Sequence, residues 1–225
     1  MEVWLRTWAI LWKDILIEVR TKGTFNAMAF FAALILFIFS FAIGPDFDLL
    51  RRIAAGLLWV GITFTGLLAL ARTYHSEELA GGLEALLLYP GEPRAIFLGK
   101  LVGNLAVLLL VEVILYPVAA VLFHMDLTGK ILPVAGIAFL GTLGFSVIGT
   151  FYAALTLHLR AREVMLPLLV LPLLVPVLLG AVSATAALVD PAAAGGVAGW
   201  VRLLIAFDVL YFVVCTWTFP VLLER

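Results

Sequence analysis

The stretch RTYHSEELAGGLEALLLYPGEPRAIFLGK, residues 72–100, is the longest polar interruption in a strongly apolar chain. It holds seven of the 29 formal charges. The apolar segments on both sides of it are too long to be ordinary strands. Of all the loops in the chain, this one has the most polar surface with which to receive an input from another protein. We therefore take it as the segment around which the rest of the chain is organised.

The composition indicates an integral membrane protein with one membrane domain over residues 1–225. Hydrophobic residues make up 64% of the chain and charged residues only 13%, about half of the roughly 25% that is usual for soluble domains. The net charge of −1 offers no basic surface for nucleic acid. The lone Cys215 excludes an internal disulfide.

Six apolar segments predict an all-α bundle, because crossing a bilayer takes about 20 apolar residues in a helix. The fifth is expected to be kinked or broken, since Pro167, Pro172 and Pro176 each remove a backbone donor. The weakly polar stretch 180–199 after it is a candidate for a re-entrant hairpin, which is tolerated only where protein covers its backbone. The predicted spans are 25–43, 53–71, 101–123, 131–157, 164–179 and 201–223.

The N-terminal residues 1–22 predict an amphipathic helix. Trp4, Trp8 and Trp12 are spaced four apart, so they share one side of the helix. Indole rings beside lysine and arginine suit the headgroup layer of a membrane. Packing of this helix against protein is an equally good interpretation. The segment lacks the continuous apolar run and the cleavage site of a signal peptide.

Lysine and arginine residues give the orientation of the chain. Ten of them fall at the two ends and in the second and fourth loops, whereas four fall in the remaining loops. The positive-inside rule then places both termini and residues 72–100 in the cytoplasm.

Within residues 72–100 the sequence predicts a short amphipathic helix close to the membrane. Ser76 can cap it, and Glu77 and Glu78 fall in the first turn, where the helix dipole favours negative charge. Acidic residues suit an anionic leaflet poorly, which favours a groove on a partner protein over the bilayer surface. Pro93 then predicts the start of a helix that continues into the third span. Four leucines share one face of the short helix: Leu79, Leu83, Leu86 and Leu87.

Two carboxylic acids fall inside the predicted spans. Glu112 lies near the middle of the third span and Asp208 about seven residues into the sixth. Because an acid at mid-bilayer costs about 2.5–3.5 kcal/mol on insertion scales, such groups usually face a bundle interior, a cavity or another subunit. Tyr116 and Tyr211 follow them by four and three residues, which places each pair on one helix face. We expect these tyrosines to form local hydrogen bonds with the acids.

The sequence gives no indication of an enzyme or of a bound cofactor or metal. The nearest approach to a phosphate loop is Gly91–Lys100, but its spacing is wrong and Leu101 stands where Ser or Thr is needed. None of the three histidines has a second ligand at metal-binding spacing. We therefore expect this chain itself to bind no nucleotide, cofactor or metal.

Several segments resemble the CcmB family, "haem exporter B", whose members are permeases of the type-2 ABC exporter kind in bacterial cytochrome c maturation. The likeness covers nearly the whole chain, and its most specific parts are LEALLLYPGEPRAIFLGK and the glutamate at position 112. The segments are KDILIEVRTK (13–22), AGLLWVGITFTGLLALAR (55–72), GGLEALLLYPGEPRAIFLGKLVGNL (81–105), LLVEVILYPVAAVLF (109–123) and FDVLYFVVCTWTFPVLLE (207–224).

The resemblance implies a dimeric permease in the bacterial inner membrane. Its partners would be the ATPase CcmA, the membrane proteins CcmC and CcmD and, indirectly, the haem chaperone CcmE, with haem as the expected substrate. ATP hydrolysis in that assembly is linked to release of the haem-loaded chaperone. The residues implied to couple the chain to the ATPase are Glu77, Glu78, Gly82, Leu83, Glu84 and Pro90, and the leucine stripe adds Leu87.

Two alternatives stay open at the level of the sequence. One is an ABC exporter for another amphiphile, such as a lipid-linked sugar. The other, from a different class, is a secondary transporter or a scaffold that transports nothing. A secondary transporter often carries inverted repeats, and none is visible in this sequence.

Overall fold

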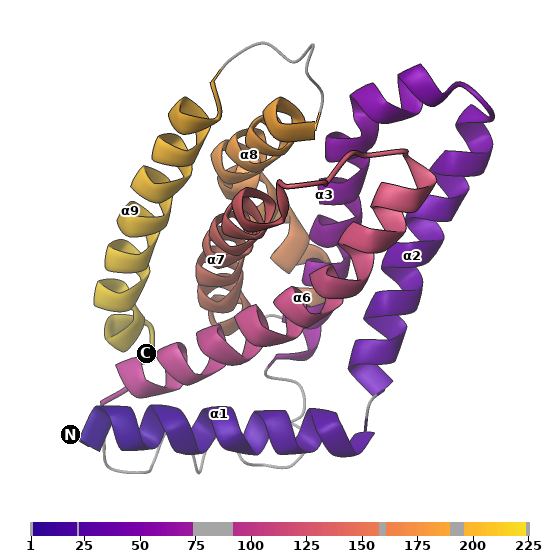
Figure 1. Ribbon diagram of the computed structural model, residues 1–225. Helices are drawn as coiled ribbons and strands as arrows, with labels where there is room; N and C mark the ends of the chain where they lie inside the picture. Colours follow the sequence, from indigo (N-terminus) through magenta and orange to yellow (C-terminus); the bar gives the residue numbers. More distant parts are fainter. Residues whose placement is uncertain (1, 22, 74–91, 158–160, 190–195, 224–225) are drawn as a thin grey trace.

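The computed structural model describes residues 2–21, 23–73, 92–157, 161–189 and 196–223. These residues form seven α-helices, and no strand occurs among them. Six of the helices are grouped as a bundle, and the first lies across one end of it (Figure 1). The helices are α1 (Glu2–Thr21), α2 (Gly23–Ile43), α3 (Phe47–Arg72), α6 (Arg94–Leu122), α7 (Ile131–Leu155), α8 (Arg162–Val189) and α9 (Val197–Leu223).

Six of these helices, α2, α3 and α6 to α9, are long and apolar enough to cross a membrane. This confirms the predicted number of spans, and the chain is a multi-pass membrane protein. Helix α3 begins six residues before the predicted span, at Phe47, because the Asp46 carboxylate accepts the Leu49 N–H (3.0 Å) and caps its first turn. Helix α6 begins directly after Pro93, as predicted, and continues through Lys100 into the third span.

The prediction of a broken fifth span followed by a re-entrant hairpin is wrong in the described residues. Helix α8 is continuous across its three prolines to Val189, and residues 197–199 already belong to α9. Each proline removes one backbone donor, but the remaining backbone hydrogen bonds keep the helix continuous. Alanines favour the helix beyond Gly180. A Cβ at Gly180 would lie 3.0 Å from the Leu204 side chain, so α8 packs closely on α9 there. Residues 190–195 lie outside the described residues.

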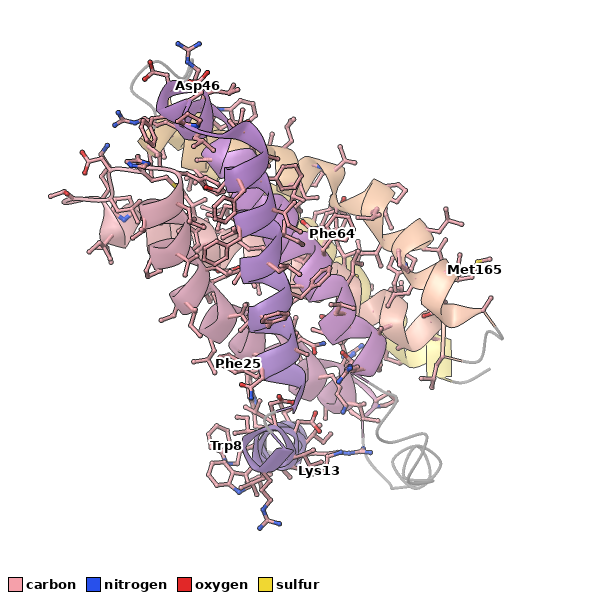
Figure 2. All side chains as sticks on the ribbon, turned by 90° about the vertical axis from the view of Figure 1, so that its right-hand side faces the viewer. Trp8, Lys13, Phe25, Asp46, Phe64 and Met165 are labelled. Atoms are coloured by element: carbon pink, nitrogen blue, oxygen red, sulfur yellow. The ribbon has the colours of Figure 1, made fainter. Side chains whose placement is uncertain are left out.

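Helix α1 forms over Glu2–Thr21, as predicted. One side packs along the start of α6, where Ile10 and Leu11 are buried. Trp4, Trp8 and Trp12 are 74%, 63% and 53% exposed, so the tryptophan stripe faces away from the bundle. Figure 2 shows α1 end-on, with Trp8 and Lys13 on opposite sides. The helix therefore packs on protein with one side and keeps the tryptophan side free.

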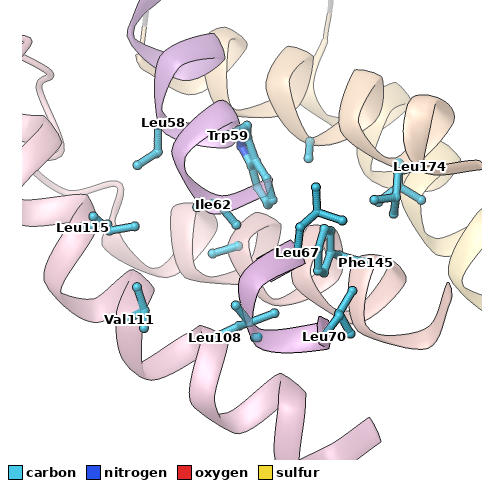
Figure 3. Close-up of a cluster of buried hydrophobic side chains, with 14 of the residues drawn as sticks. Leu58, Trp59, Ile62, Leu67, Leu70, Leu108, Val111, Leu115, Phe145 and Leu174 are labelled. Carbon is cyan, nitrogen blue, oxygen red and sulfur yellow. The ribbon is translucent and has the colours of Figure 1, made fainter. Parts of the chain in front are cut away.

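The core of the bundle lies around α3 and α7, where large side chains of each helix pack against glycines of the other. The Trp59 ring of α3 fills the space that a Cβ at Gly141 of α7 would occupy, and the Phe145 ring of α7 does the same at Gly66 of α3. Leu70 of α3 lies in the same way against Gly149. Figure 3 shows Trp59 and Phe145 within this packed cluster. Small residues at these positions let the helix backbones approach closely.

Candidate functional site

The residues predicted to couple the chain to an ATPase lie outside the described residues. The structure describes the chain again from Glu92, where it leads into α6. The site can therefore be built from the start of α6 inward. The predicted coupling residues are Glu77, Glu78, Gly82, Leu83, Glu84, Leu87 and Pro90, and we call the stretch 77–90 that they span the coupling segment.

The start of α6 carries a buried cation. Lys100 lies in its second turn with a side chain that is only 2% exposed. Its Nζ atom lies 2.9 Å from Oδ2 of Asp14 on α1, whose side chain is 23% exposed. A buried ammonium group is costly unless it is paired, so this ion pair belongs to the way α1 and α6 are held together.

Farther along α6, Glu112 is buried inside the bundle. The Thr142 hydroxyl of α7 donates a hydrogen bond to Glu112 Oε1, and the two residues are 3% and 0% exposed. The second oxygen, Oε2, has no hydrogen-bond partner among the described residues. Glu112 therefore faces the bundle interior, as expected for an acid in a membrane span.

Polar groups from two further helices extend this contact. The indole N–H of Trp59 on α3 donates to Thr185 Oγ1 on α8 (3.0 Å). The Tyr116 hydroxyl lies near Thr185 and the Glu112 carboxyl but forms no hydrogen bond of regular geometry. We call Trp59, Glu112, Tyr116, Thr142 and Thr185 the buried polar cluster. It joins α3, α6, α7 and α8 at one place in the core.

The second acid, Asp208 of α9, is 4% exposed and packs against Gly144 of α7. Neither of its carboxyl oxygens has a hydrogen-bond partner among the described residues. Asp208 does not join the buried polar cluster. It lies against Gly144, whereas Glu112 lies against Thr142, and two positions apart on a helix point to nearly opposite sides. The structure thus places the two acids on either side of α7.

The predicted local bonds from the two tyrosines are not found. Tyr211 donates its hydroxyl to the backbone carbonyl of Leu173 on α8 (3.1 Å). Leu173 lies between Pro172 and Pro176, where α8 lacks backbone donors. The hydrogen bond to Glu112 is donated by Thr142 and not by Tyr116, whose hydroxyl has no hydrogen-bond partner among the described residues. Neighbouring helices thus supply the partners of Glu112 and Tyr211, which were expected within the same helix.

At the opposite end of the bundle from α1, the connection between α6 and α7 carries exposed charges. The Asp126 carboxylate accepts the backbone N–H of Thr128 (3.0 Å). This bond lowers the pKa of Asp126 below its ordinary value, and the cations Lys130 and Arg51 add to the effect. His124 adopts a left-handed backbone conformation (φ 53°), and its ring centroid lies 4.4 Å from that of Phe47 with the two planes tilted by 57°. The described residues hold no group of three or more potential metal ligands.

Sequence reasoning missed Thr142, Thr185 and Trp59, because a hydroxyl or an indole inside a span carries no pattern of its own. The Asp14–Lys100 pair did leave a signal. Thr7, Ile10 and Asp14 follow helical spacing on a side of α1 away from the tryptophans. A carboxylate on a face that is otherwise buried indicates a cation on the element that covers it.

The sequence profile of the CcmB protein family matches residues 5–225. The chain belongs to the CcmB family. It is 34% identical over 171 residues to heme exporter protein B of Rhodobacter capsulatus, covering 76% of this chain and 78% of the relative. It is also 34% identical to the proteins of the same name from Haemophilus influenzae (174 residues, 77% and 78%) and Escherichia coli K12 (178 residues, 79% and 80%).

The CcmB match confirms the resemblance read from the sequence. It covers α1 from residue 5 onward, the predicted coupling residues, the buried polar cluster and Asp208. The described geometry and the family assignment therefore concern the same stretch of chain.

Proposed function

We propose that this chain is the membrane-spanning permease subunit of an ABC complex that handles haem during cytochrome c biogenesis. The observation that carries the proposal is the CcmB family match over residues 5–225. Relatives named heme exporter protein B, which align over about four fifths of the chain, support haem as the substrate. The chain passes the energy of ATP hydrolysis through the membrane and does not itself hydrolyse ATP.

The partners follow from this role. A CcmA-like ATPase binds ATP and Mg²⁺ and docks on the predicted coupling residues within 74–91. CcmC-like and CcmD-like membrane proteins complete the assembly, which contains two copies of this chain and releases a haem-loaded CcmE-like chaperone. The complex lies in the bacterial inner membrane with both termini in the cytoplasm. The common position of α1 and the C-terminal end of α9 at one end of the bundle supports this orientation (Figure 1).

The route for the input runs along α6. This helix begins directly after the coupling segment, and Lys100 and Glu112 both lie on it. Twelve residues separate them, which is about 18 Å along a helix. A displacement at the start of α6 would therefore reach the buried polar cluster through one continuous rigid element. In that cluster, the hydrogen bond from Thr142 to Glu112 links α6 to α7, so that the displacement of α6 also moves α7.

The tryptophan stripe of α1 lies in the lipid headgroup layer in this arrangement. Indole rings prefer this layer because one edge is apolar and the N–H finds water or headgroups. The exposed positions of Trp4, Trp8 and Trp12 support this placement.

The test is co-expression with a CcmA-like ATPase, followed by purification and measurement of ATP hydrolysis with and without haem-loaded chaperone. Charge reversal at Glu77, Glu78 and Glu84 should abolish co-purification or stimulation. Reversal of the exposed Asp48, at the other end of α3, is the matched control and should leave both intact.

Three outcomes would contradict the proposal. Unchanged stimulation after the triple reversal would remove the coupling role. Stimulation that ignores the haem-loaded chaperone would indicate another amphiphile as the substrate. Proton-dependent flux in vesicles without any ATPase would indicate a secondary transporter.

A further inference from the structure

The contact between α1 and the start of α6 contains the buried ion pair. Lys100 Nζ lies 2.9 Å from Asp14 Oδ2, and the other carboxylate oxygen lies 3.3 Å from Lys13 Nζ. The side chain of Lys100 is 2% exposed and that of Lys13 is 41% exposed. Because a surface pair contributes little and a buried one is sensitive to loss of a partner, Lys100 is the cation that makes this contact specific.

The backbones of the two helices are also in close contact around the ion pair. A Cβ added to Gly99 would lie 2.9 Å from Ile10 Cβ and 3.2 Å from the Thr7 carbonyl oxygen. One turn earlier on α6, the Ala95 carbonyl accepts the Thr7 hydroxyl (3.4 Å). Positions 95 and 99 lie one above the other on a helix, so α1 covers one continuous face of the first turns of α6.

A second connection fixes the other end of α1. The Glu18 carboxylate accepts the backbone N–H of Phe25 in the first turn of α2 (2.7 Å). A carboxylate at this place also complements the positive end of the α2 dipole. Helix α1 is thereby held to the beginnings of two membrane spans, and its tryptophan side stays exposed.

These contacts lie where the chain emerges from the predicted coupling segment. We propose that Asp14 and Lys100 are positioning residues that clamp the first turns of α6 to α1, so that a displacement of the coupling segment moves the two helices as one unit. This inference rests on the proposed function. Without this ion pair, the start of α6 could shift against α1, and the displacement of the coupling segment would not be transmitted to the membrane interior.

The first experiment uses the full complex with its ATPase, and the readout is cytochrome c matured per ATP hydrolysed. Asp14→Asn and Lys100→Met should each lower this ratio at least ten-fold, while the ATPase still co-purifies. The charge swap of Asp14→Lys with Lys100→Asp places the same two charges across the same contact, and it should restore the ratio to within about three-fold of wild type.

A reversible covalent bond gives the second experiment. Cysteines at positions 10 and 99 have Cβ atoms close enough for a disulfide after a sub-ångström shift. Lys100→Met combined with Ile10→Cys and Gly99→Cys, in a Cys215→Ala background, should regain coupling when oxidised and lose it again on reduction. The same sample serves as its own folding control, because only the bond between α1 and α6 changes.

The results separate this inference from the proposed function. If the wild-type complex shows no chaperone-dependent ATP hydrolysis, the proposed function fails. If the wild type couples and the single variants couple equally well, the clamp is refuted. It is also refuted if neither the charge swap nor the disulfide restores coupling to variants that still assemble with the ATPase.

Discussion

Helix α6 carries two buried ionisable side chains, and their surroundings differ. Lys100, near the start, faces the carboxylate of Asp14 on another helix. Glu112, about 18 Å farther along, receives one hydroxyl hydrogen bond from Thr142 and forms no ion pair with a described residue. A charge pair is tolerable near the membrane surface, where water is close, whereas the bundle interior favours contacts between uncharged groups. The difference indicates that the contact at Lys100 depends on charge and the contact at Glu112 on shape and hydrogen bonding.

The largest effect on stability should come from Asp14→Asn. It removes a carboxylate that lies 2.9 Å from the Nζ atom of a lysine that is 2% exposed, and loss of one partner of a buried pair costs about 3 kcal/mol. The measurement is the unfolding free energy of the purified protein in detergent. A matched control is Asp48→Asn, an exposed carboxylate in the first turn of α3, which should change it by less than about 0.5 kcal/mol. Equal losses from both variants would show that the ion pair at Lys100 contributes nothing specific.

Thr142→Val should have the next largest effect, about 2 kcal/mol, because it keeps the shape but leaves the buried Glu112 carboxyl without its donor. The same unfolding measurement applies. Thr218→Val is the control, since that exposed hydroxyl donates to carbonyls of its own helix, Val214 (2.7 Å) and Cys215 (3.5 Å). If the two threonine variants behave alike, the contact between α6 and α7 depends on packing alone.

Glu112→Gln should cost less than about 1 kcal/mol, because the side chain keeps its shape and its amide oxygen still accepts from Thr142. Glu112→Leu, which removes the acceptor, should cost about as much as Thr142→Val. A loss from Gln as large as that from Leu would contradict the comparison, since it would mean that the charge of Glu112 matters in the interior.

The smallest effect is expected at the exposed Asp126. Its lowered pKa means that its carboxylate stabilises the folded state at pH values above the ordinary value of 3.8, and that this contribution disappears as the pH falls through the lowered pKa. Melting temperatures of wild type and Asp126→Asn should therefore differ slightly at pH 6 and converge toward pH 3. A difference that grows as the pH falls would have the wrong sign.

The sequence predicted those features that depend on local pattern. Long apolar runs predicted the six spans, the spacing of Trp4, Trp8 and Trp12 predicted α1, and Pro93 predicted the start of α6. It failed where a neighbouring helix decides the outcome. Pro172 and Pro176 suggested a break, but α8 stays helical with α7 and α9 packed against it.

In the candidate site, too, the sequence predicted the positions of the residues but not their partners on other helices. The positions of Glu112 and Asp208 inside spans were readable from the sequence, and their burial is as expected. Their partners were not, because Thr142 and Gly144 are about 30 and 60 residues away and nothing in the local spacing selects them. A single substitution at either partner tests a contact that only the folded chain brings together.

The glycines between α3 and α7 also limit how the bundle can move. Trp59 and Gly141, Phe145 and Gly66, and Leu70 and Gly149 alternate which helix supplies the large side chain. Sliding either helix along the other would press these large side chains against the backbone of the facing helix at three levels. Steric clashes therefore oppose any sliding of α3 along α7. We therefore expect α3 and α7 to move as a single body, and any relative motion within the bundle to involve α2 and α9, whose spans are the least buried.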